Sequence, residues 1–461
     1  MAQNPRNQKP HRNRRKPGSK PLPQGEFPAH VESLTLEGHG VAHVDGKATF
    51  IGRALPGEEV RFVYRDQRRR FDLGDAVAID RPSPDRIEPG CPHVHRCGGC
   101  AMQHLAPDAQ VAHKQQALLD QLSRIGRVEP EQLLEPLTGP IWGYRRMARL
   151  GVRFVRKQGR VRVGFREPGS PMIADIDTCS VLDPRVGEKL PAIAELIAGL
   201  EAYRDIPQIE VGCGDDHCAL AFRHMVPLDE VDRARLDAFA DDHGFAIFLQ
   251  PGGPETLTPL VAGERDIYPS YRLEDFDVEI RFSPLDFAQV NAEINRRMVC
   301  QALDWLAVEP GDRVLDLFAG LGNFSLPLAR RTGVDGSVTA VEADEAMVKR
   351  GAQSAAANGI GNTRHVVGNL FEPDASLGWM RESFDRVLLD PPRAGAGAMM
   401  PVIARMKPQR VVYVSCHPGS LARDVGQLVH EHGWRLVAAG VMDMFPHTAH
   451  VESMAVLEPG R

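Results

Sequence analysis

The sequence predicts an α/β protein in which a mainly parallel, doubly wound sheet forms the C-terminal part and follows two β-rich regions. Three observations lead to this fold class. Strands and helices alternate from about residue 291 onward, short strands broken by turn residues fill residues 27–81, and irregular β-rich sequence lies between them. Strands that alternate with helices are typical of a parallel sheet, whereas closely spaced short strands are typical of a small barrel.

The length and the charge of the chain limit the number of domains and the kinds of partner. A chain of 461 residues has room for two or three domains with separate cores. The net charge of −6 argues against a nucleic-acid partner, yet residues 1–24 carry seven Lys and Arg side chains and no acid. We expect a disordered basic tail there, which either contacts a polyanion or serves only solubility. With no secretory segment and no apolar stretch of about 18 residues, we expect a cytoplasmic monomer without a membrane partner.

Residues 25–83 are predicted to form a small β-barrel of the oligonucleotide-binding type around the Asp45-Gly46 turn. The predicted strands are short alternating stretches at residues 31–36, 48–51, 59–64 and 76–79, with about five strands in all. The loop Arg65–Arg70 is basic, as a loop that faces RNA would be. A solvated turn on a generic small β domain fits the same residues.

Residues 84–285 are predicted to form a β-rich central domain with a metal-binding cysteine cluster. Cys91, Cys97 and Cys100 have the spacing C-x5-C-x2-C, and Cys179 is the next cysteine. Four thiolates suit zinc or an iron–sulfur cluster, but zinc ribbons usually pair two C-x2-C motifs, so we expect a [4Fe–4S] cluster. Without an extracellular context, cysteines favour metal binding or catalysis over disulfides. Three others are predicted to be structural or incidental: Cys213, Cys218 and Cys300.

Residues 286–461 are predicted to form the α/β domain, and a helix over residues 108–125 is expected to pack on it. The domain begins with a predicted helix over residues 291–306. The predicted strands are residues 314–318, 337–342, 364–367, 386–390, 411–415, 435–442 and 451–457.

The turn after the first of these strands is a candidate nucleotide-cofactor site. Gly320 and Gly322 permit close backbone approach, and a helix predicted to open at Asn323 supplies amide donors. Glu342 ends the next strand, where a carboxylate can accept hydrogen bonds from ribose hydroxyls. The glycine spacing is not GxGxxG, so S-adenosylmethionine, which has a ribose and no pyrophosphate, fits better than NAD. An ordinary glycine-bearing turn is the alternative.

Later strands end in further candidate residues. Asp390 begins the stiff Asp390-Pro-Pro-Arg393 loop, and Asn369 ends the third strand, where a simple turn residue is the alternative. Cys416 ends the fifth strand, and Glu452 lies at the start of the last one. Ligands bind beyond the carboxyl ends of such strands, so Cys416 is a candidate nucleophile. Glu452 is a candidate general base on the condition that it faces the same pocket. An inert buried thiol and a solvated strand end are the alternatives.

Together these features resemble the RNA uracil-C5 methyltransferase family, in particular its iron–sulfur branch that acts on 23S rRNA. The resemblance covers nearly the whole chain after the tail. It implies a TRAM-type N-terminal barrel, a [4Fe–4S] cluster on the four cysteines, Cys416 as nucleophile and Glu452 as base. Phe287-Ala-Gln289-Val-Asn291 matches the family's F-x-Q-x-N segment. The family's S-adenosylmethionine contacts fall on Gln289, Phe318, Asn323, Glu342, Asn369 and Asp390.

The resemblance implies methyl transfer to C5 of a uracil, expected at uracil 1939 of 23S rRNA. Addition of Cys416 to C6 makes C5 nucleophilic, and Glu452 then removes the C5 proton. The base must be extruded, so a single-stranded or loop segment of RNA is the expected substrate, with Phe287 as a candidate stacking partner. The alternatives are another rRNA or tRNA uracil, a cytosine, and a non-catalytic ribosome-assembly factor. We expect the cluster to stabilise the central domain and to shape an RNA surface.

Overall fold

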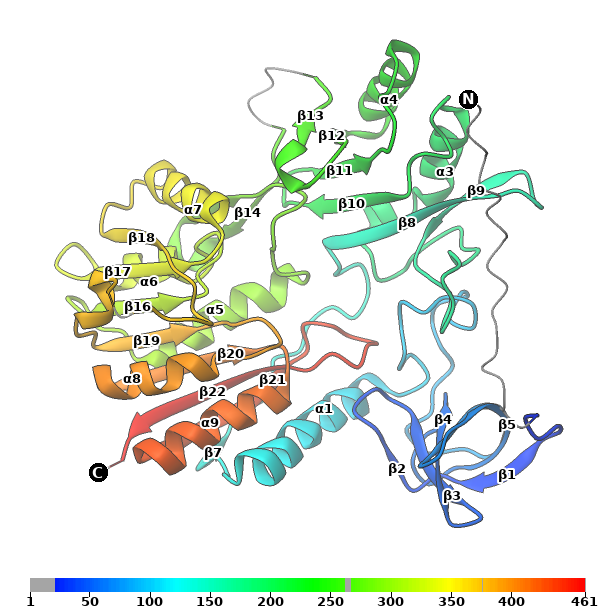
Figure 1. The fold of residues 1–461 in the computed structure, drawn as a ribbon, viewed down its shortest axis with the longest axis horizontal. Helices are drawn as coiled ribbons and strands as arrows, with labels where there is room; N and C mark the ends of the chain where they lie inside the picture. The colour runs from blue at the N-terminus through cyan, green and yellow to red at the C-terminus, as the bar shows by residue number, and fades with distance from the viewer. Residues whose placement is uncertain (1–20, 262–266, 375, 461) are drawn as a thin grey trace, which may run out of the picture. The chain divides into compact units, whose positions relative to one another are not determined.

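The computed structural model describes residues 21–261, 267–374 and 376–460 (Figure 1). Two compact units divide the chain between Arg86 and Ile87. This division lies close to the boundary predicted after residue 83, whereas the boundary predicted after residue 285 falls inside the second unit. Residues 1–20 of the predicted basic tail lie outside the described residues. Across the described residues, no helix is long and apolar enough to cross a membrane.

The first unit is a curled, six-stranded sheet with the order β1-β5-β6-β4-β3-β2, in which β1 also contacts β3. The strands are β1 Phe27–His30, β2 Ser33–Leu34, β3 Gly40–Val44, β4 Lys47–Gly52, β5 Glu59–Gln67 and β6 Asp72–Arg81. Irregular pairing between β5 and β6 bends the sheet, as β-bulges do. Its core is made of small and branched apolar side chains around Phe62: Ala29, Val31, Ala42, Ile51, Ala54 and Val60.

Of the strand predicted over residues 31–36, only the two-residue strand β2 forms. Val31 separates β1 from β2, because its backbone bonds to Glu58 and Gly57 instead of continuing one ladder. The Asp45-Gly46 turn is confirmed between β3 and β4, with φ of 51° and 76°. Positive φ at both central residues is the requirement of a type I′ hairpin.

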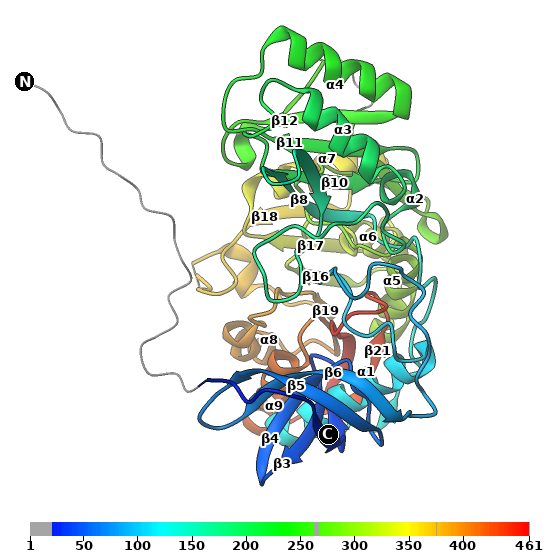
Figure 2. The same ribbon diagram turned by 90° about the vertical axis from the view of Figure 1, so that its right-hand side faces the viewer.

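The second unit contains a six-stranded sheet with the order β13-β12-β11-β10-β8-β9, whose strands are labelled in Figure 1. Figure 2 shows β8, β10, β11 and β12 from a second direction. Its strands are β8 Met147–Val155, β9 Arg160–Gly164, β10 Gln208–Cys213, β11 Cys218–Arg223, β12 Phe245–Gln250 and β13 Thr258–Pro259. Helices α2 Pro184–Gly187, α3 Leu190–Gly199 and α4 Glu230–His243 accompany the sheet, followed by the two-stranded pair β14 Ser270–Leu273 and β15 Val278–Arg281. α4 is the crossover that makes β12 parallel to β11.

The second unit also contains an eight-stranded sheet with the order β18-β17-β16-β19-β20-β22-β21-β7. Its strands are β7 Gln132–Leu133, β16 Arg313–Leu317, β17 Ser337–Glu342, β18 Thr363–Val367, β19 Arg386–Leu389, β20 Arg410–Ser415, β21 Trp434–Met442 and β22 Glu452–Pro459. The strands β16 to β20 are mutually parallel, and β22 inserts antiparallel between β20 and β21. The predicted doubly wound fold is therefore confirmed for this part of the chain.

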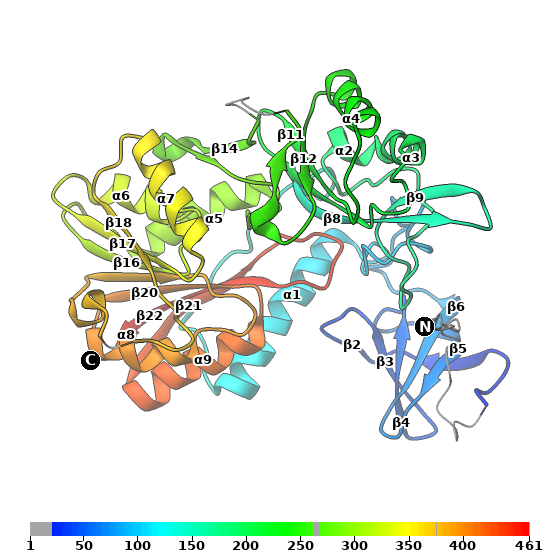
Figure 3. The same ribbon diagram turned by 45° about the horizontal axis from the view of Figure 1, so that its top comes forward.

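Helices cover both faces of this sheet (Figure 3). One face carries α5 Ala292–Leu306, α6 Ser325–Thr332 and α7 Glu345–Ala357, and the other carries α8 Met400–Met406, α9 Pro418–His432 and α1 Pro107–Gln121. Because both faces are covered, β20 is buried along almost its whole length. The helix predicted to open at Asn323 begins two residues later, at Ser325.

Helix α1 packs on α9 and β21, as predicted for residues 108–125. The α-helix ends at Gln121 and a π-helical turn, Leu122–Gly126, continues it. Two glycines allow this close contact: a Cβ at Gly426 would lie 2.7 Å from the carbonyl oxygen of Gly126. The helix α1 and the strand β7 thus precede the six-stranded sheet in sequence but pack with the eight-stranded sheet.

Candidate active site

The candidate residues collect at one edge of the parallel sheet. Asp316, Glu342 and Asp390 lie at the carboxyl ends of β16, β17 and β19, and Asn369 and Cys416 follow β18 and β20. Parallel strands place these ends side by side, which is where open α/β sheets bind ligands. The strand-end residues predicted from the sequence therefore lie along one edge of the sheet.

Cys416 and Glu452 lie beside the last residue pair of two antiparallel strands, near enough for the Glu452 charge to act on the thiol. Ser415 of β20 pairs with Ser453 of β22, and the Ser453 hydroxyl donates to the Ser415 carbonyl oxygen at 3.1 Å. In this register the residue after Ser415 lies opposite the residue before Ser453. Glu452 is only 3% exposed, whereas Cys416 is partly exposed. A thiol that a ligand can reach thus lies beside a buried carboxyl.

The charges at this edge act on one another. Burial, then the Glu452 and Asp390 carboxylates, raise the pKa of the Cys416 thiol to about 11, and the Arg393 guanidinium opposes this rise. Burial and the Asp390 charge raise the pKa of Glu452 well above its ordinary value. Burial raises the pKa of Asp390 to about 7. The resting thiol is therefore protonated at neutral pH, and the two carboxyl groups resist simultaneous ionisation.

Gln289 joins this group from the segment ahead of α5. Its Nε2 lies 3.5 Å from Oδ2 of Asp390. Gln289 also lines a pocket with Tyr271, Asn295 and Arg146. Phe287, two residues earlier, is 68% exposed. An exposed aromatic ring can stack on a planar ligand.

The turn after β16 has the backbone conformation that its glycines permit. Gly320 and Gly322 have φ of 54° and 95°, and Phe318 is also left-handed at 63°. The Glu342 carboxylate accepts hydrogen bonds from the amides of Gly320 at 3.2 Å and Ala343 at 2.7 Å. Glu342 therefore fixes the turn while its remaining lone pairs stay available to a ligand.

Asp316 was not among the candidate site residues predicted from the sequence. It is 1% exposed, and its Oδ2 accepts from the Ser325 hydroxyl at 2.5 Å, while its Oδ1 has no hydrogen-bond partner among the residues that the structure describes. Burial raises the pKa of Asp316 to about 7. A buried acceptor without a donor at the cofactor turn is a place for a ligand's N–H group. Its position at the end of an apolar strand was the available sequence signal.

Asn323 and Asn369 serve local structure. The Asn323 side chain bonds Tyr271 at 3.0 Å and exchanges hydrogen bonds with Asn295 at 2.9 and 2.8 Å. Asn369 is exposed and accepts from the Phe371 amide at 3.0 Å, which is an Asx turn. The ring of Phe371 lies 5.8 Å from that of Phe318. Neither Tyr271 nor Asn295 carried a sequence signal, because both lie outside the strand-end motifs.

The four predicted metal ligands form a second site within the second unit. One pocket is lined by all four cysteines, Cys91, Cys97, Cys100 and Cys179, together with apolar side chains. Burial raises the pKa of Cys97 to about 11 and that of Cys100 to about 12, and neighbouring thiols contribute to both rises. All four cysteines are free. The structure therefore brings Cys179 to the other three across a long separation in sequence.

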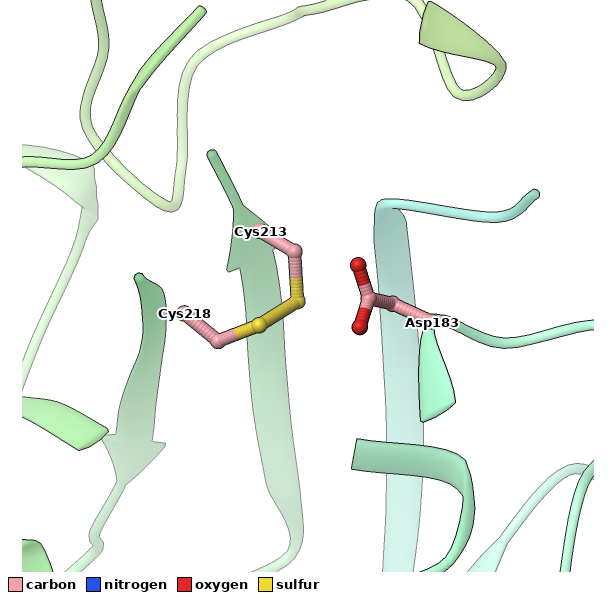
Figure 4. A group of neighbouring side chains, drawn as sticks. All are labelled: Asp183, Cys213 and Cys218. Carbon is pink, nitrogen blue, oxygen red and sulfur yellow. A yellow bond between two sulfur atoms is a disulfide. The ribbon is translucent and has the colours of Figure 1, made fainter. Parts of the chain in front are cut away.

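Cys213 and Cys218 form a disulfide beside Asp183 (Figure 4). These two cysteines pair across β10 and β11 with their Cα atoms 4.0 Å apart. The expectation that the cysteines avoid disulfides is wrong here, because the hairpin register places these two opposite each other. The three side chains are close enough for a metal ion, but the thiols are bonded to each other and Asp183 caps α2. Cys300 stays a single thiol, which donates to Asp275 at 3.2 Å.

Comparisons with known proteins agree with this geometry. The family model described as tRNA (Uracil-5-)-methyltransferase matches residues 260–369 and 375–459. A relative from Alkalilimnicola ehrlichii named 23S rRNA (uracil(1939)-C(5))-methyltransferase RlmD is 52% identical over 437 residues, covering 95% of this chain and 97% of its own. A relative of the same name from Xanthomonas axonopodis pv. citri is 50% identical, covering 95% and 98%.

A solved structure shares the fold. It is the Pyrococcus abyssi tRNA (uracil-54, C5)-methyltransferase in complex with S-adenosyl-L-homocysteine, with a TM-score of 0.70 and 23% identity. The match covers 94% of this chain and 100% of the other.

Proposed function

The chain belongs to the RNA uracil-C5 methyltransferase family, and from that premise we propose that it methylates C5 of a uracil in 23S rRNA, giving 5-methyluridine. The proposed target is uracil 1939, which the names of the relatives specify. One observation supports the chemistry most strongly: Cys416 lies opposite Glu452 at the edge of the sheet where ligands bind.

Cys416 is the proposed nucleophile. S-adenosylmethionine supplies an electrophilic methyl group, but uracil C5 is too weak a nucleophile to take it unaided. When the Cys416 sulfur bonds to C6, the ring becomes an enolate with negative charge at C5, which can accept the methyl group. Arg393 is the cation near Cys416 that favours the thiolate over the thiol.

Glu452 is the proposed general base. After methylation, C5 carries both the new methyl group and its original proton. Transfer of that proton to the Glu452 carboxylate restores the ring double bond as the bond between sulfur and C6 breaks. Its burial and the nearby Asp390 charge give Glu452 a high affinity for a proton.

The turn after β16 is the proposed S-adenosylmethionine site. Glu342 has lone pairs for ribose hydroxyls, and the free Oδ1 of Asp316 suits an N–H donor of the cofactor. The remaining proposed contacts are Gln289, Phe318, Asn323, Asn369 and Asp390. Asn323 would contribute in part through Tyr271 and Asn295, since its amide already bonds both.

The four-cysteine site is the proposed [4Fe–4S] site. Its donor set of four free thiols and its apolar walls fit a cluster. No step of methyl transfer needs an electron, so the role we assign to Cys91, Cys97, Cys100 and Cys179 is structural. Anaerobically purified protein should be brown and contain iron and sulfide, and stoichiometric zinc would refute this assignment.

The first unit is the proposed TRAM-type RNA-binding domain. Its sheet topology suits a small barrel, and the loop residues Arg68, Arg69 and Arg70 are exposed. Within the second unit we propose a central iron–sulfur domain up to residue 285 and a methyltransferase domain from residue 286. We further propose a cytoplasmic monomer whose substrate is a single-stranded or loop segment of 23S rRNA, with the target base stacked on Phe287.

Methylation of 23S rRNA that lacks 5-methyluridine tests the proposed function. The protein and labelled S-adenosylmethionine should place one methyl group in the fragment that contains uracil 1939, identified by mass spectrometry of nuclease digests. Cys416→Ala should transfer none. Label in another rRNA or in tRNA would identify a different target, and no transfer to any RNA would favour a non-catalytic role.

A further inference from the structure

Gln110, a buried residue on α1, forms hydrogen bonds with the loop that precedes Glu452. This loop, residues 443–451, joins β21 to β22. The amide of His447 donates to Oε1 of Gln110 at 2.8 Å, and Nδ1 of His447 lies 3.3 Å from Nε2 of Gln110. Gln110 is 1% exposed and His447 is equally buried. A contact between residues so distant in sequence can fix the loop only through the tertiary fold.

Gln110 ties the same loop to the segment that follows the cysteines. Its Nε2 donates to the carbonyl oxygens of Met102 at 3.0 Å and Leu105 at 2.7 Å. The amides of Ala101 and Met102 in turn donate to the carbonyl oxygen of His447 at 2.9 and 3.0 Å. The residues directly after Cys100 are therefore hydrogen-bonded to the loop that carries Glu452.

A buried ion pair fixes the start of the loop. Nζ of Lys114, one helical turn after Gln110, donates to Asp443 at 2.6 Å and to the carbonyl oxygen of Phe445 at 2.9 Å. The side chains of Lys114 and Asp443 are 1% and 4% exposed. Such a buried pair holds its geometry tightly, because either charge alone would be left desolvated. Tyr144 adds a hydrogen bond to the carbonyl oxygen of Pro446 at 2.9 Å.

The two reacting side chains are held by different parts of the fold. Cys416 lies between β20, inside the sheet, and the N-terminus of α9, where His417 accepts from the Ser420 amide. Glu452 is the first residue of β22, so the loop before it sets where its backbone begins. His447 has a φ of 65°, a conformation that a non-glycine residue keeps only when its surroundings enforce it. A loss of the hydrogen bonds that fix the loop would therefore displace Glu452 without displacing Cys416.

We propose that Gln110 is a positioning residue for Glu452, which it holds through His447 in the place needed to remove the C5 proton. This inference rests on the proposed function. The hydrogen bonds of Gln110, Ala101 and Met102 to the loop 443–451 therefore link the residues that follow Cys100 to the position of the proposed general base. Gln110 thus acts after the covalent adduct has formed and not in its formation.

Gln110→Met tests this assignment, because methionine keeps the length of the side chain and removes its hydrogen bonds. Gln116→Met is the matched control, since Gln116 is exposed on the same helix and bonds only Asp120. Each protein is mixed with S-adenosylmethionine and an RNA fragment that contains either uracil or 5-fluorouracil at the target position. Denaturing gels then measure the covalent protein–RNA complex, and initial rates measure turnover.

With 5-fluorouracil no C5 proton can leave, so the wild type, Gln110→Met and Gln116→Met should all form the adduct. With uracil, Gln110→Met should turn over about a hundredfold more slowly, as expected for a misplaced catalytic group. It should also accumulate a methylated covalent complex, which the wild type and Gln116→Met do not. A merely structural role would lower both adducts together.

Turnover of Gln110→Met at the wild-type rate would overturn the proposal, and so would parallel loss of its 5-fluorouracil adduct and its turnover. If urea unfolding shows that Gln110→Met does not fold, Thr448→Val decides by the same criteria. That change removes the hydrogen bonds that the Thr448 hydroxyl makes to Phe445 and His450 within the loop. If the wild-type protein forms no adduct with 5-fluorouracil, the proposed function is refuted, and the proposed role of Gln110 is refuted with it.

Discussion

Replacing Glu452 with glutamine should make the Cys416 thiol more reactive, although it should abolish turnover. Glu452 is the larger of the two carboxylate effects that raise the pKa of Cys416 to about 11. At pH 8 a thiol with that pKa is ionised in about one molecule in a thousand. Because the pKa of Glu452 is itself raised, its charge acts on Cys416 only towards the alkaline end of the range, where Glu452 is ionised. A like charge close by shifts a pKa by about one or more, so in that range Glu452→Gln should raise the thiolate fraction, and with it the alkylation rate, about tenfold.

Alkylation by iodoacetamide between pH 6 and 10, followed by mass spectrometry of the Cys416 peptide, measures this change. Cys300 is an internal control: burial, with the nearby Asp275, raises its pKa to about 11 as well, and neither Glu452 nor Asp390 contributes. Its rate should be the same in both proteins. An unchanged or lower rate at Cys416 in Glu452→Gln at the alkaline end of this range, where Glu452 is ionised, would refute the arrangement of the thiol and the carboxyl described above.

Three further perturbations test the packing and charges around the site. Lys114→Met should lower the free energy of unfolding by about 3–5 kcal/mol in urea titrations, because it leaves Asp443 charged and buried; a loss below about 1 kcal/mol would contradict the buried pair. The raised pKa of Asp316 means that the folded state binds its proton more tightly than the unfolded state, so this group lowers stability as the pH rises from about 4 to about 7. Asp316→Asn should remove that loss, so the free energy of unfolding of the variant, measured relative to that of the wild type, should be higher at pH 8 than at pH 4. A difference between the two proteins that does not change with pH would contradict this reasoning. Gly426→Ala should lower the free energy of unfolding by about 1–3 kcal/mol, since its Cβ would meet the Gly126 carbonyl oxygen. Gly199→Ala, whose Cβ would have no described atom within 4 Å, should not lower it; equal effects would refute the close contact of α9 with the π-helical turn.

The parallel sheet and its binding edge could be predicted because local patterns determine them. Apolar β-branched runs such as residues 411–415 are strands that both faces of a sheet bury, and the motifs at their ends follow directly. The two-residue strand β7 was not predicted, because Gln132 and Leu133 are exposed and are defined only by their pairing with β21. Strand Gly40–Val44 was missed for a similar reason, since its alternation is short and glycine-led.

The site was predictable as a list of residues but not as an arrangement. Cys416 and Glu452 were identified separately, and only the register of β20 with β22 places them opposite each other. Gln110 and His447 lie 337 positions apart, so no sequence pattern links them. The Asp316 carboxyl could not be predicted from the sequence as part of the site, because its unpaired oxygen is a property of the folded turn. Long-range polar contacts of this kind depend on the packing of α1 against the sheet.

The covalent step is the central claim, and trapping with 5-fluorouracil tests it most directly. The protein, S-adenosylmethionine and a 23S rRNA fragment with 5-fluorouracil at position 1939 should give a complex that survives denaturation, with Cys416 bonded to C6 in its mass spectrum. Cys416→Ala should give none, and Cys300→Ala should give the full amount. A complex that persists in Cys416→Ala, or an intact wild-type protein that forms none, would contradict the account.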